Sequence, residues 1–371
     1  MTGFGLKRRA SLPRVNAVVT IKDVAARAGV STATVSRVLA GKGGVGKKVR
    51  AQVSEAVQQL AYQPNRVARD LRMGSRKVIG VVILDLQNPF NTAVVRGIES
   101  VLWGEGYSLL LGHSDSLVER ERTQLDVLRA EGVGGLILIP CNAPEANYEA
   151  LRAWNIPIVA ADRMPRDLQV DFVRSNNQEA MFEATQHLLS HGYKEIALIN
   201  GPAGISVAQE RLAGYCAALR GAGLVPREDL IIHSDFRQDG GHAAMERLLR
   251  PAKPPRAVLI ASNLMTLGAL QAIHERDLQI PEQIAVLGFD DMPWATSLRP
   301  PLTAVAQPVE EIGRTAAKLL LDRLNDRTLL PRQVILPATL MVRASCGAHA
   351  ASKDPKSGGR SLEVKRGRQR R

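Results

Sequence analysis

The sequence contains little of what a disulfide-stabilised, zinc-binding or membrane-spanning protein needs. Its three cysteines, Cys141, Cys216 and Cys346, lie far apart and never in CxxC spacing, which argues against a disulfide framework and a zinc site. No apolar run reaches the ~18 residues of a membrane-spanning helix, and the N-terminus lacks the apolar core of a signal peptide. We therefore expect a soluble, cytoplasmic protein.

Signals of catalysis are also missing. There is no GxSxG or HExxH motif, and the seven histidines are scattered without a nucleophile at matching strand ends. We predict a protein without enzymatic activity, without a metal site and without a cofactor. An enzyme would have to depend on His113 or His233, which lie near acidic residues.

The net charge of +13 is distributed unevenly over the 371 residues. Residues 20–77 contain twelve Lys and Arg against three acids, a net +9, and residues 1–19 add +4. Residues 351–371 carry +6, which leaves −6 for residues 78–350. A basic head on an acidic body indicates a polyanionic partner for the head, whereas the charge of the tail is equally compatible with simple solvation.

The segment TIKDVAARAGVSTATVSRVLAG, residues 20–41, predicts two short helices. Apolar residues recur at helical spacing on both sides of Gly29, and Thr20 and Ser31 can cap the two helices. The order of a small residue, a turn glycine and a buried β-branched residue is typical of a helix-turn-helix. Side chains near the start of the second helix can reach base edges, while hydroxyls and amide N–H groups hold phosphates.

The loop GKGGVGKK, residues 41–48, is close to the phosphate-binding loop of nucleotide-binding proteins but does not fit it. That loop needs a buried strand before it and a Ser or Thr after its lysine to ligate magnesium. Here a helix precedes the loop, Lys48 replaces the magnesium ligand, and a third amphipathic helix follows. We interpret the loop as a connection that places Lys47 and Lys48 at a helix N-terminus near DNA phosphate. The DNA contacts predicted in the head are Thr20, Ser31, Thr32, Ala33, Thr34, Ser36, Arg37, Lys47 and Lys48.

The segment YQPNRVARDLRMG, residues 62–74, narrows the kind of DNA-binding protein to which the head can belong. A helix-turn-helix, a third helix and a Pro-Asn-Arg-Val-Ala segment at this spacing resemble the LacI/GalR family of bacterial transcriptional regulators. In that family the segment is a hinge helix that forms on the operator and inserts a leucine into the minor groove. The resemblance implies that Leu71 is the wedge, with Asn65, Arg69 and Arg72 beside the DNA backbone.

Several positions of the head depart from that family. Ala40, Gly46 and Val49 stand where the family commonly has phosphate contacts or caps, and Asp70 adds a negative charge beside the wedge. The basic residues around the start of the third helix substitute by charge, which exchanges directional hydrogen bonds for salt-sensitive attraction.

From residue 77 onward, short apolar runs alternate with helical stretches. The runs predict buried parallel strands and therefore two doubly wound α/β subdomains. The family resemblance extends to about residue 345 and implies a periplasmic-binding-protein-like fold with a ligand cleft between two lobes. The predicted division is a flexible basic extension (1–19), an all-α helix-turn-helix DNA-binding head (20–63), a hinge helix and linker (64–76), an effector-binding and dimerisation domain (77–345) and a disordered basic tail (346–371).

Polar and aromatic side chains follow the predicted strands at the ends where ligands bind in open α/β sheets. A carboxylate and an arginine beside an apolar wall suit a neutral carbohydrate. Some positions have alternatives: the aromatic residues could be core, Asp290 could cap a helix, and relatives with purine effectors use a similar cleft. The predicted effector contacts, of which Arg211, Phe236 and Asn263 follow from the family resemblance, are Asn88, Phe90, Asp162, Arg211, Phe236, Asn263, Asp290 and Trp294.

Together these features predict a sequence-specific DNA-binding transcriptional regulator, a repressor whose operator affinity is controlled by a small effector, a sugar or sugar derivative. Its expected partners are pseudo-palindromic double-stranded operator DNA, the effector and a second copy of the chain. Residues 351–371 contain a single leucine and no heptad seam, so we predict a homodimer rather than a tetramer. The alternative is an α/β sugar-binding or sugar-modifying protein with an incidental basic head.

Overall fold

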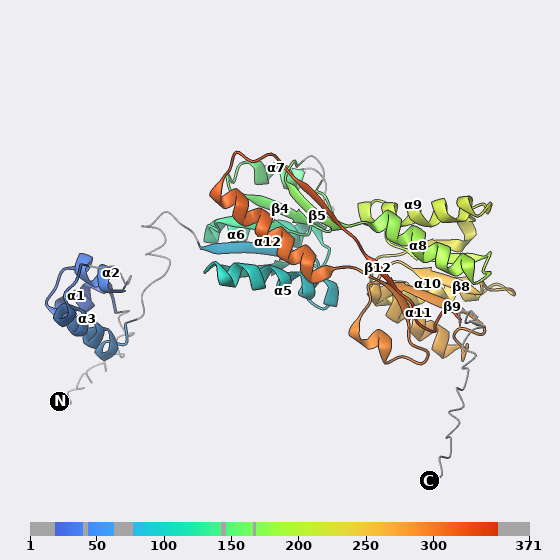
Figure 1. Cartoon of the computed structure of the whole chain (residues 1–371), viewed down its shortest axis with the longest axis horizontal. Helices are drawn as coiled ribbons and strands as arrows, with labels where there is room; N and C mark the ends of the chain where they lie inside the picture. Colours follow the sequence, from blue (N-terminus) through green and yellow to red (C-terminus); the bar gives the residue numbers. More distant parts are fainter. Residues whose placement is uncertain (1–18, 40–43, 63–76, 142–145, 166–167, 348–371) are drawn as a thin grey trace, which may run out of the picture. The chain divides into compact units, whose positions relative to one another are not determined.

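The structure is a computed structural model that describes residues 19–39, 44–62, 77–141, 146–165 and 168–347 (Figure 1). The chain divides into two compact units, residues 1–76 and residues 77–371. The described part of the first unit contains helices and no strand, and the second unit contains two six-stranded sheets with helices between the strands. The predicted fold class, an all-α head followed by an α/β body with two lobes, is confirmed.

The head is built from three helices around a small core. They are α1 (Ile21–Ala28), α2 (Thr32–Leu39) and α3 (Lys47–Gln59). Before α1, the backbone N–H and the hydroxyl of Thr20 both donate to the Asp23 carboxylate at 2.7 Å. The helix ends at Gly29, whose φ of 65° is the left-handed conformation that glycine adopts without strain. The helices enclose the buried side chains of Val24, Ala25, Val35, Val53 and Ala56.

Lobe 1 is a parallel sheet with strand order β11-β5-β4-β3-β1-β2. Its strands are β1 (Val78–Ile83), β2 (Ser108–His113), β3 (Gly135–Leu138), β4 (Ile158–Ala161), β5 (Asp171–Ser175) and β11 (Gln333–Leu336). Its helices are α5 (Pro89–Gly104), α6 (Val118–Glu131), α7 (Ala146–Arg152) and α12 (Val309–Asn325). The central strands are fully buried, as continuous apolar runs in a doubly wound sheet require.

Lobe 2 repeats this plan with strand order β12-β10-β9-β8-β6-β7. Its strands are β6 (Ile196–Asn200), β7 (Ile231–His233), β8 (Ala257–Ile260), β9 (Ala285–Phe289), β10 (Thr303–Ala306) and β12 (Thr339–Met341). Its helices are α8 (Asn177–Ser190), α9 (Ser206–Gly221), α10 (Gln238–Leu249) and α11 (Asn263–Glu275), with short 3-10 turns at Glu228–Leu230 and Pro293–Thr296. The sequence predicts a parallel sheet. The edge strand β12, however, pairs antiparallel with β10, so the prediction is wrong for this strand.

The chain passes between the lobes at three places, from β5 to α8, from β10 to α12 and from β11 to β12 (Figure 1). Two of these segments are bonded to each other. The backbone N–H of Asn176 donates to the Leu336 carbonyl at 3.1 Å, and the side-chain oxygen of Asn176 accepts from the Ala338 backbone at 2.7 Å. These bonds tie two of the crossing segments together where the lobes meet.

Helices α5 and α12 pack side by side on lobe 1 through a pair of glycines (Figure 1). A Cβ atom on Gly97 would overlap the carbonyl oxygen of Glu310, and one on Gly313 would overlap the carbonyl oxygen of Val94. The two backbones can approach this closely only because neither position carries a side chain. This contact holds α12, which follows one crossing segment, against the body of lobe 1.

Candidate functional site

The exposed face of α2 carries the side chains that we predicted to face DNA. Thr32, Ala33, Ser36 and Arg37 are exposed, whereas Val35 is completely buried in the head. Ser31 and Thr34, two other predicted contacts, also cap the helix: the Ser31 hydroxyl accepts from the Thr34 backbone N–H at 3.2 Å and shares a 2.9 Å hydrogen bond with the Thr34 hydroxyl. Ser31 is the N-cap of α2. The side chains of Thr32, Ala33, Ser36 and Arg37 form the open face of the helix.

The N-terminus of α3 is also exposed and positively charged. Lys47 and Lys48 form its first turn, which contains no acidic residue, and its N-cap Gly46 provides no side-chain hydrogen bond. Two cations at the positive end of a helix are unfavourable unless an anion lies nearby. Thr20 is held by Asp23 at the start of α1. The predicted hinge contacts Asn65, Arg69, Leu71 and Arg72 lie outside the described residues.

A cleft between the two lobes contains most of the predicted effector contacts. Its lining comes from both lobes and includes six of the eight predicted residues, namely Asn88, Phe90, Asp162, Arg211, Phe236 and Asp290. Asn263 lies directly behind the lining, 2% exposed, and its amide donates to the side-chain oxygen of Asn88 at 2.8 Å. Trp294 is not part of the lining; it is partly buried against the core of lobe 2.

Arg211 is a nearly buried cation that the protein holds from three sides. Its Nε donates to the Asn177 side chain at 2.9 Å, its Nη1 donates to the Ala261 carbonyl at 2.6 Å, and its guanidinium lies 3.8 Å from the centre of the Phe289 ring. Burial lowers the pKa of Arg211, while the charges of Asp290 and Asp162 act in the opposite direction. An arginine remains charged under these conditions, so this residue presents a fixed, oriented cation to the cleft.

Asp290 is the matching carboxylate at the end of β9. It is 7% exposed and accepts a 2.5 Å hydrogen bond from the side-chain amide of Gln307. Burial raises the pKa of Asp290, and the charge of Arg211 opposes that rise. Gln307 belongs to the crossing segment from β10 to α12, and Asn177 is the first residue of α8, directly after the crossing from β5. The arginine and the carboxylate are therefore both attached to the connection between the lobes.

Asp162 and Phe236 complete the cleft in strained conformations. Their φ angles of 61° and 64°, like the 71° of Asp290, lie in the left-handed region, which costs non-glycine residues energy and recurs at ligand sites. A Cβ atom on Gly201 would overlap the Phe236 ring, so this glycine makes room for it. The guanidinium of Arg163 lies 5.5 Å from the centre of the same ring.

Several lining residues were not predicted as contacts. Arg163 is 6% exposed, lies 3.8 Å from the Asp162 carboxylate and has a buried Nε without a hydrogen-bond partner in the described part of the chain. Its place directly after a buried strand was the available signal. Gln307 has no comparable signal, because its role depends on where the chain crosses between the lobes. The remaining unpredicted lining residues are Leu84, Asn91, Val207 and Ser262.

The two lobes lie close together across the cleft. The bond between Asn263 and Asn88 joins them, and Arg237 of lobe 2 donates to the Asp115 carbonyl of lobe 1 at 2.8 Å. The cleft has a volume of only about 50 Å³. A ligand of more than a few atoms therefore does not fit the cleft in this structure without a change in its walls.

Two further properties concern the described residues alone. No group of three or more His, Cys, Asp and Glu side chains among them is arranged to hold a metal ion. None of the helices within the described ranges is both long and apolar enough to cross a membrane.

Most of the chain is similar in sequence to known proteins. Residues 20–65 match the family model described as bacterial regulatory proteins, lacI family, and residues 185–346 match the periplasmic binding protein-like domain. The chain is 36% identical over 329 residues to the ribose operon repressor of Escherichia coli (strain K12), covering 88% of this chain and 100% of that relative.

Solved structures show the same similarity. The lac repressor dimer bound to operator and the anti-inducer ONPF is 30% identical with a TM-score of 0.79, covering 89% of this chain and 99% of that one. The complex of the transcriptional regulator CelR with cellobiose is 35% identical with a TM-score of 0.68, covering 88% and 99%. Both the head and the two-lobed body therefore have counterparts in structures of regulators.

Proposed function

This chain belongs to the lacI family of bacterial regulatory proteins, and from that premise we propose which residues carry its function. It is a DNA-binding transcriptional repressor whose operator affinity is controlled by a small effector, and it acts as a homodimer on pseudo-palindromic DNA. The relatives are named as repressors and regulators, which favours this function over an enzymatic one. A repressor works where the chromosome lies, so we place it in the cytoplasm, bound to the nucleoid through its operator.

The effector that the cleft suits is a neutral sugar. Arg211 and Asp290 offer a donor and an acceptor in a nearly buried site, and adjacent hydroxyls of a sugar can accept from the one and donate to the other. Phe236 supplies an apolar surface beside them. A charged ligand of either sign would repel one member of this pair, which a neutral polyhydroxyl compound does not.

The attachment of this pair to the crossing segments carries the proposal. Arg211 is bonded to Asn177 and Asp290 is bonded to Gln307. A sugar that forms hydrogen bonds with either side chain competes with the bonds to Asn177 and Gln307, which lie where the chain passes from one lobe to the other. It thereby favours one arrangement of the lobes over another, which is the requirement for an effector to change affinity elsewhere.

On the DNA side, we propose that the open face of α2 enters the major groove. Thr32, Ala33, Ser36 and Arg37 would contact base edges, with Arg37 as the residue suited to a guanine. Lys47 and Lys48 would contact phosphates, where they add affinity without sequence preference. The hinge residues Asn65, Arg69, Leu71 and Arg72 keep the roles that the family resemblance implies.

Substitution of Asp290 tests the effector site. Asp290→Asn keeps the size of the side chain and removes its charge, so sugar binding should weaken about tenfold or more, while operator affinity without sugar stays unchanged. Anisotropy of a labelled operator, obtained by selection from random duplexes, measures both quantities, with D-ribose as the first sugar and other neutral monosaccharides after it.

The matched control is Asp229→Asn, an exposed carboxylate of the same lobe that is paired with Arg227. This variant should respond to the sugar like the wild-type chain. A sugar response that is identical in wild type and Asp290→Asn would show that the effector does not use this carboxylate. Sugar binding without any preference for operator over random DNA would instead favour a plain sugar-binding protein.

A further inference from the structure

Lobe 1 contains a second, larger cavity that is separate from the cleft. Its volume is about 340 Å³, and its walls come from the residues just before β4 and β5 and from the end of α12. The cleft residues Asp162 and Arg163 follow β4, whereas the cavity residues Ile156 and Pro157 precede it. A four-residue strand spans roughly 13 Å, so the cavity and the cleft open at opposite edges of the same sheet.

The polar part of the cavity wall is cationic. Arg152, Arg323 and Arg327 line it, and the lining contains no carboxylate among the described residues. Guanidinium groups that line one cavity can share a single oxyanion through their forked donors. These arginines lie together in residues 78–350, a part of the chain whose net charge is −6.

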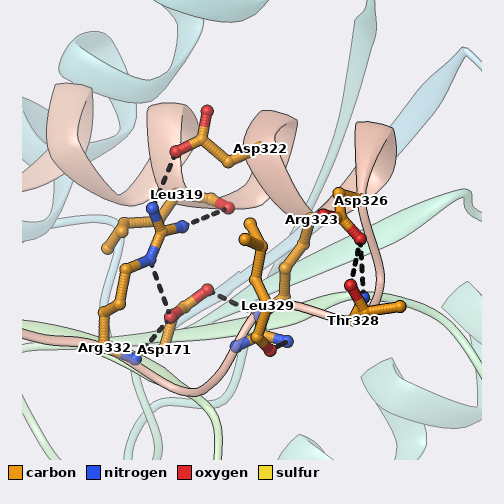
Figure 2. Close-up of polar contacts among 8 residues, drawn as sticks. All are labelled: Asp171, Leu319, Asp322, Arg323, Asp326, Thr328, Leu329 and Arg332. Carbon is orange, nitrogen blue, oxygen red and sulfur yellow. Dashed lines mark hydrogen bonds and ion pairs between the residues drawn. The ribbon is translucent and has the colours of Figure 1, made fainter.

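Arg323 retains a donor beyond those that its own fold uses (Figure 2). Its Nε donates to the Asp171 carboxylate at 2.6 Å and its Nη1 donates to the Leu329 carbonyl at 3.0 Å. Its Nη2 is buried and has no hydrogen-bond partner within the described ranges. The carboxylate of Asp171 is shared with Arg332, which donates to it from its backbone and its side chain. Asp171 therefore does not neutralise Arg323 alone.

Arg327 lies two residues after the end of α12 and lines the cavity from there. Its Nη1 donates to the Asn155 carbonyl at 2.8 Å, which holds the guanidinium at the rim, and its side chain is otherwise exposed. The remaining wall is apolar and includes Leu151, Ile156 and Val170. A cavity with a cationic rim and an apolar wall matches a small molecule that has an anionic group and an apolar body.

We propose that this cavity is a second ligand site, which binds a small organic anion whose phosphate or carboxylate group lies between Arg323 and Arg327 and whose body packs against the apolar wall. The fork of donors on each guanidinium suits both kinds of oxyanion. The positive charge of Arg323, whose Asp171 carboxylate is shared with Arg332, favours the anion there, and the exposed Arg327 supplies donors at the rim. Because the site lies at the edge of the sheet remote from the cleft, it can be occupied independently of the sugar.

Calorimetric titration of the full chain with phenyl phosphate and with benzoate tests this proposal. Saturable binding of one molecule per chain is expected for at least one of the two anions, and the stronger of the two identifies the preferred group. Benzyl alcohol, which has a similar ring and no charge, should not bind. Arg327→Gln should weaken binding of the preferred anion about tenfold or more, because a charged hydrogen bond of typical strength is lost.

Arg256→Gln is the matched control. Arg256 is an exposed arginine of lobe 2 that donates to the Glu282 carbonyl at 2.6 Å, so it makes the same kind of contact outside the cavity. The basic head attracts anions in all three proteins equally. Absence of saturable binding, or equal affinity of wild type and Arg327→Gln in proteins with the same thermal unfolding midpoint, would overturn the proposal.

Discussion

At the scale of single residues, Asp171 shows how lobe 1 holds a charge that water does not reach. It is 0% exposed, and its two oxygens accept from Arg323 Nε at 2.6 Å and from the Arg332 backbone N–H at 2.7 Å. Burial acts to raise the pKa of this carboxyl, but the hydrogen bonds from both arginines outweigh it and hold the pKa below its ordinary value. The carboxylate joins β5 to α12 and to the segment before β11 (Figure 2).

Asp171→Asn should therefore destabilise the body by about 3–5 kcal/mol near pH 7, because it leaves a buried guanidinium without its counter-charge. A carboxyl whose folded-state pKa is depressed stabilises the fold above its unfolded-state pKa, and this contribution is lost as the pH falls through the folded-state pKa. The difference between wild type and variant should shrink below about pH 4.

Urea unfolding followed by tryptophan fluorescence measures this difference, since Trp103, Trp154 and Trp294 all belong to the body. Asp326→Asn is the control, because Asp326 is exposed and its carboxylate accepts from Thr328 alone among the described residues. A difference for Asp171→Asn that stays constant from pH 7 to pH 3 would show that its charge does not stabilise the fold.

Which of these residues could be predicted depends on whether their role is local. Asp162 and Asp290 directly follow buried strands, so their place at a cleft could be inferred from the apolar runs before them. Asp171 opens a strand that the sequence did not reveal, and its partners lie 152 and 161 positions away. Gln307 and Asn177 likewise depend on crossings between lobes, for which the local sequence contains no signal.

At the scale of elements, the three head helices, the body helices α5, α6, α8, α9 and α11, and the apolar strands including the edge strand β2 could be predicted, whereas the edge strands β11 and β12 and the polar strand β5 could not. The strands β1, β3, β4, β6, β8 and β9 are continuous apolar runs buried on both faces. By contrast β5 contains Asp171 and Arg174, and β11 is exposed at alternate positions. Their pairing depends on contacts with distant elements, which an apolar run does not encode.

The crossing of α5 and α12 makes a prediction at this scale. Gly97→Ala should destabilise the body by about 1–3 kcal/mol, because the new methyl group meets the backbone of Glu310 and the helices must separate. Gly104→Ala in the same helix should change stability by less than about 0.5 kcal/mol, since nothing lies within 4 Å of a Cβ atom there. Urea unfolding of the two variants side by side measures both. Equal effects would mean that the helix crossing tolerates separation.

At the scale of the whole molecule, the basic head and residues 78–350 of the body differ in the sign of their net charge. Residues 20–77 carry a net +9 and residues 78–350 a net −6, so DNA is attracted to the head and the body does not compete for it. The body supplies the cleft, where we propose that a sugar binds Arg211 and Asp290. Charge alone, however, explains attraction to any DNA, and discrimination between sequences is the role that we propose for α2 and the hinge segment.

Selection of bound sequences from a pool of random duplexes by the full chain is the most direct test of the central claim. The account predicts enrichment of a pseudo-palindrome whose two halves are related by the symmetry of a dimer, bound at least about a thousandfold more tightly than random DNA. Arg37→Ala, used in the same selection, should relax one position in each half-site. A pool that stays random after repeated selection by the wild-type chain would contradict the assignment of this protein as a sequence-specific repressor.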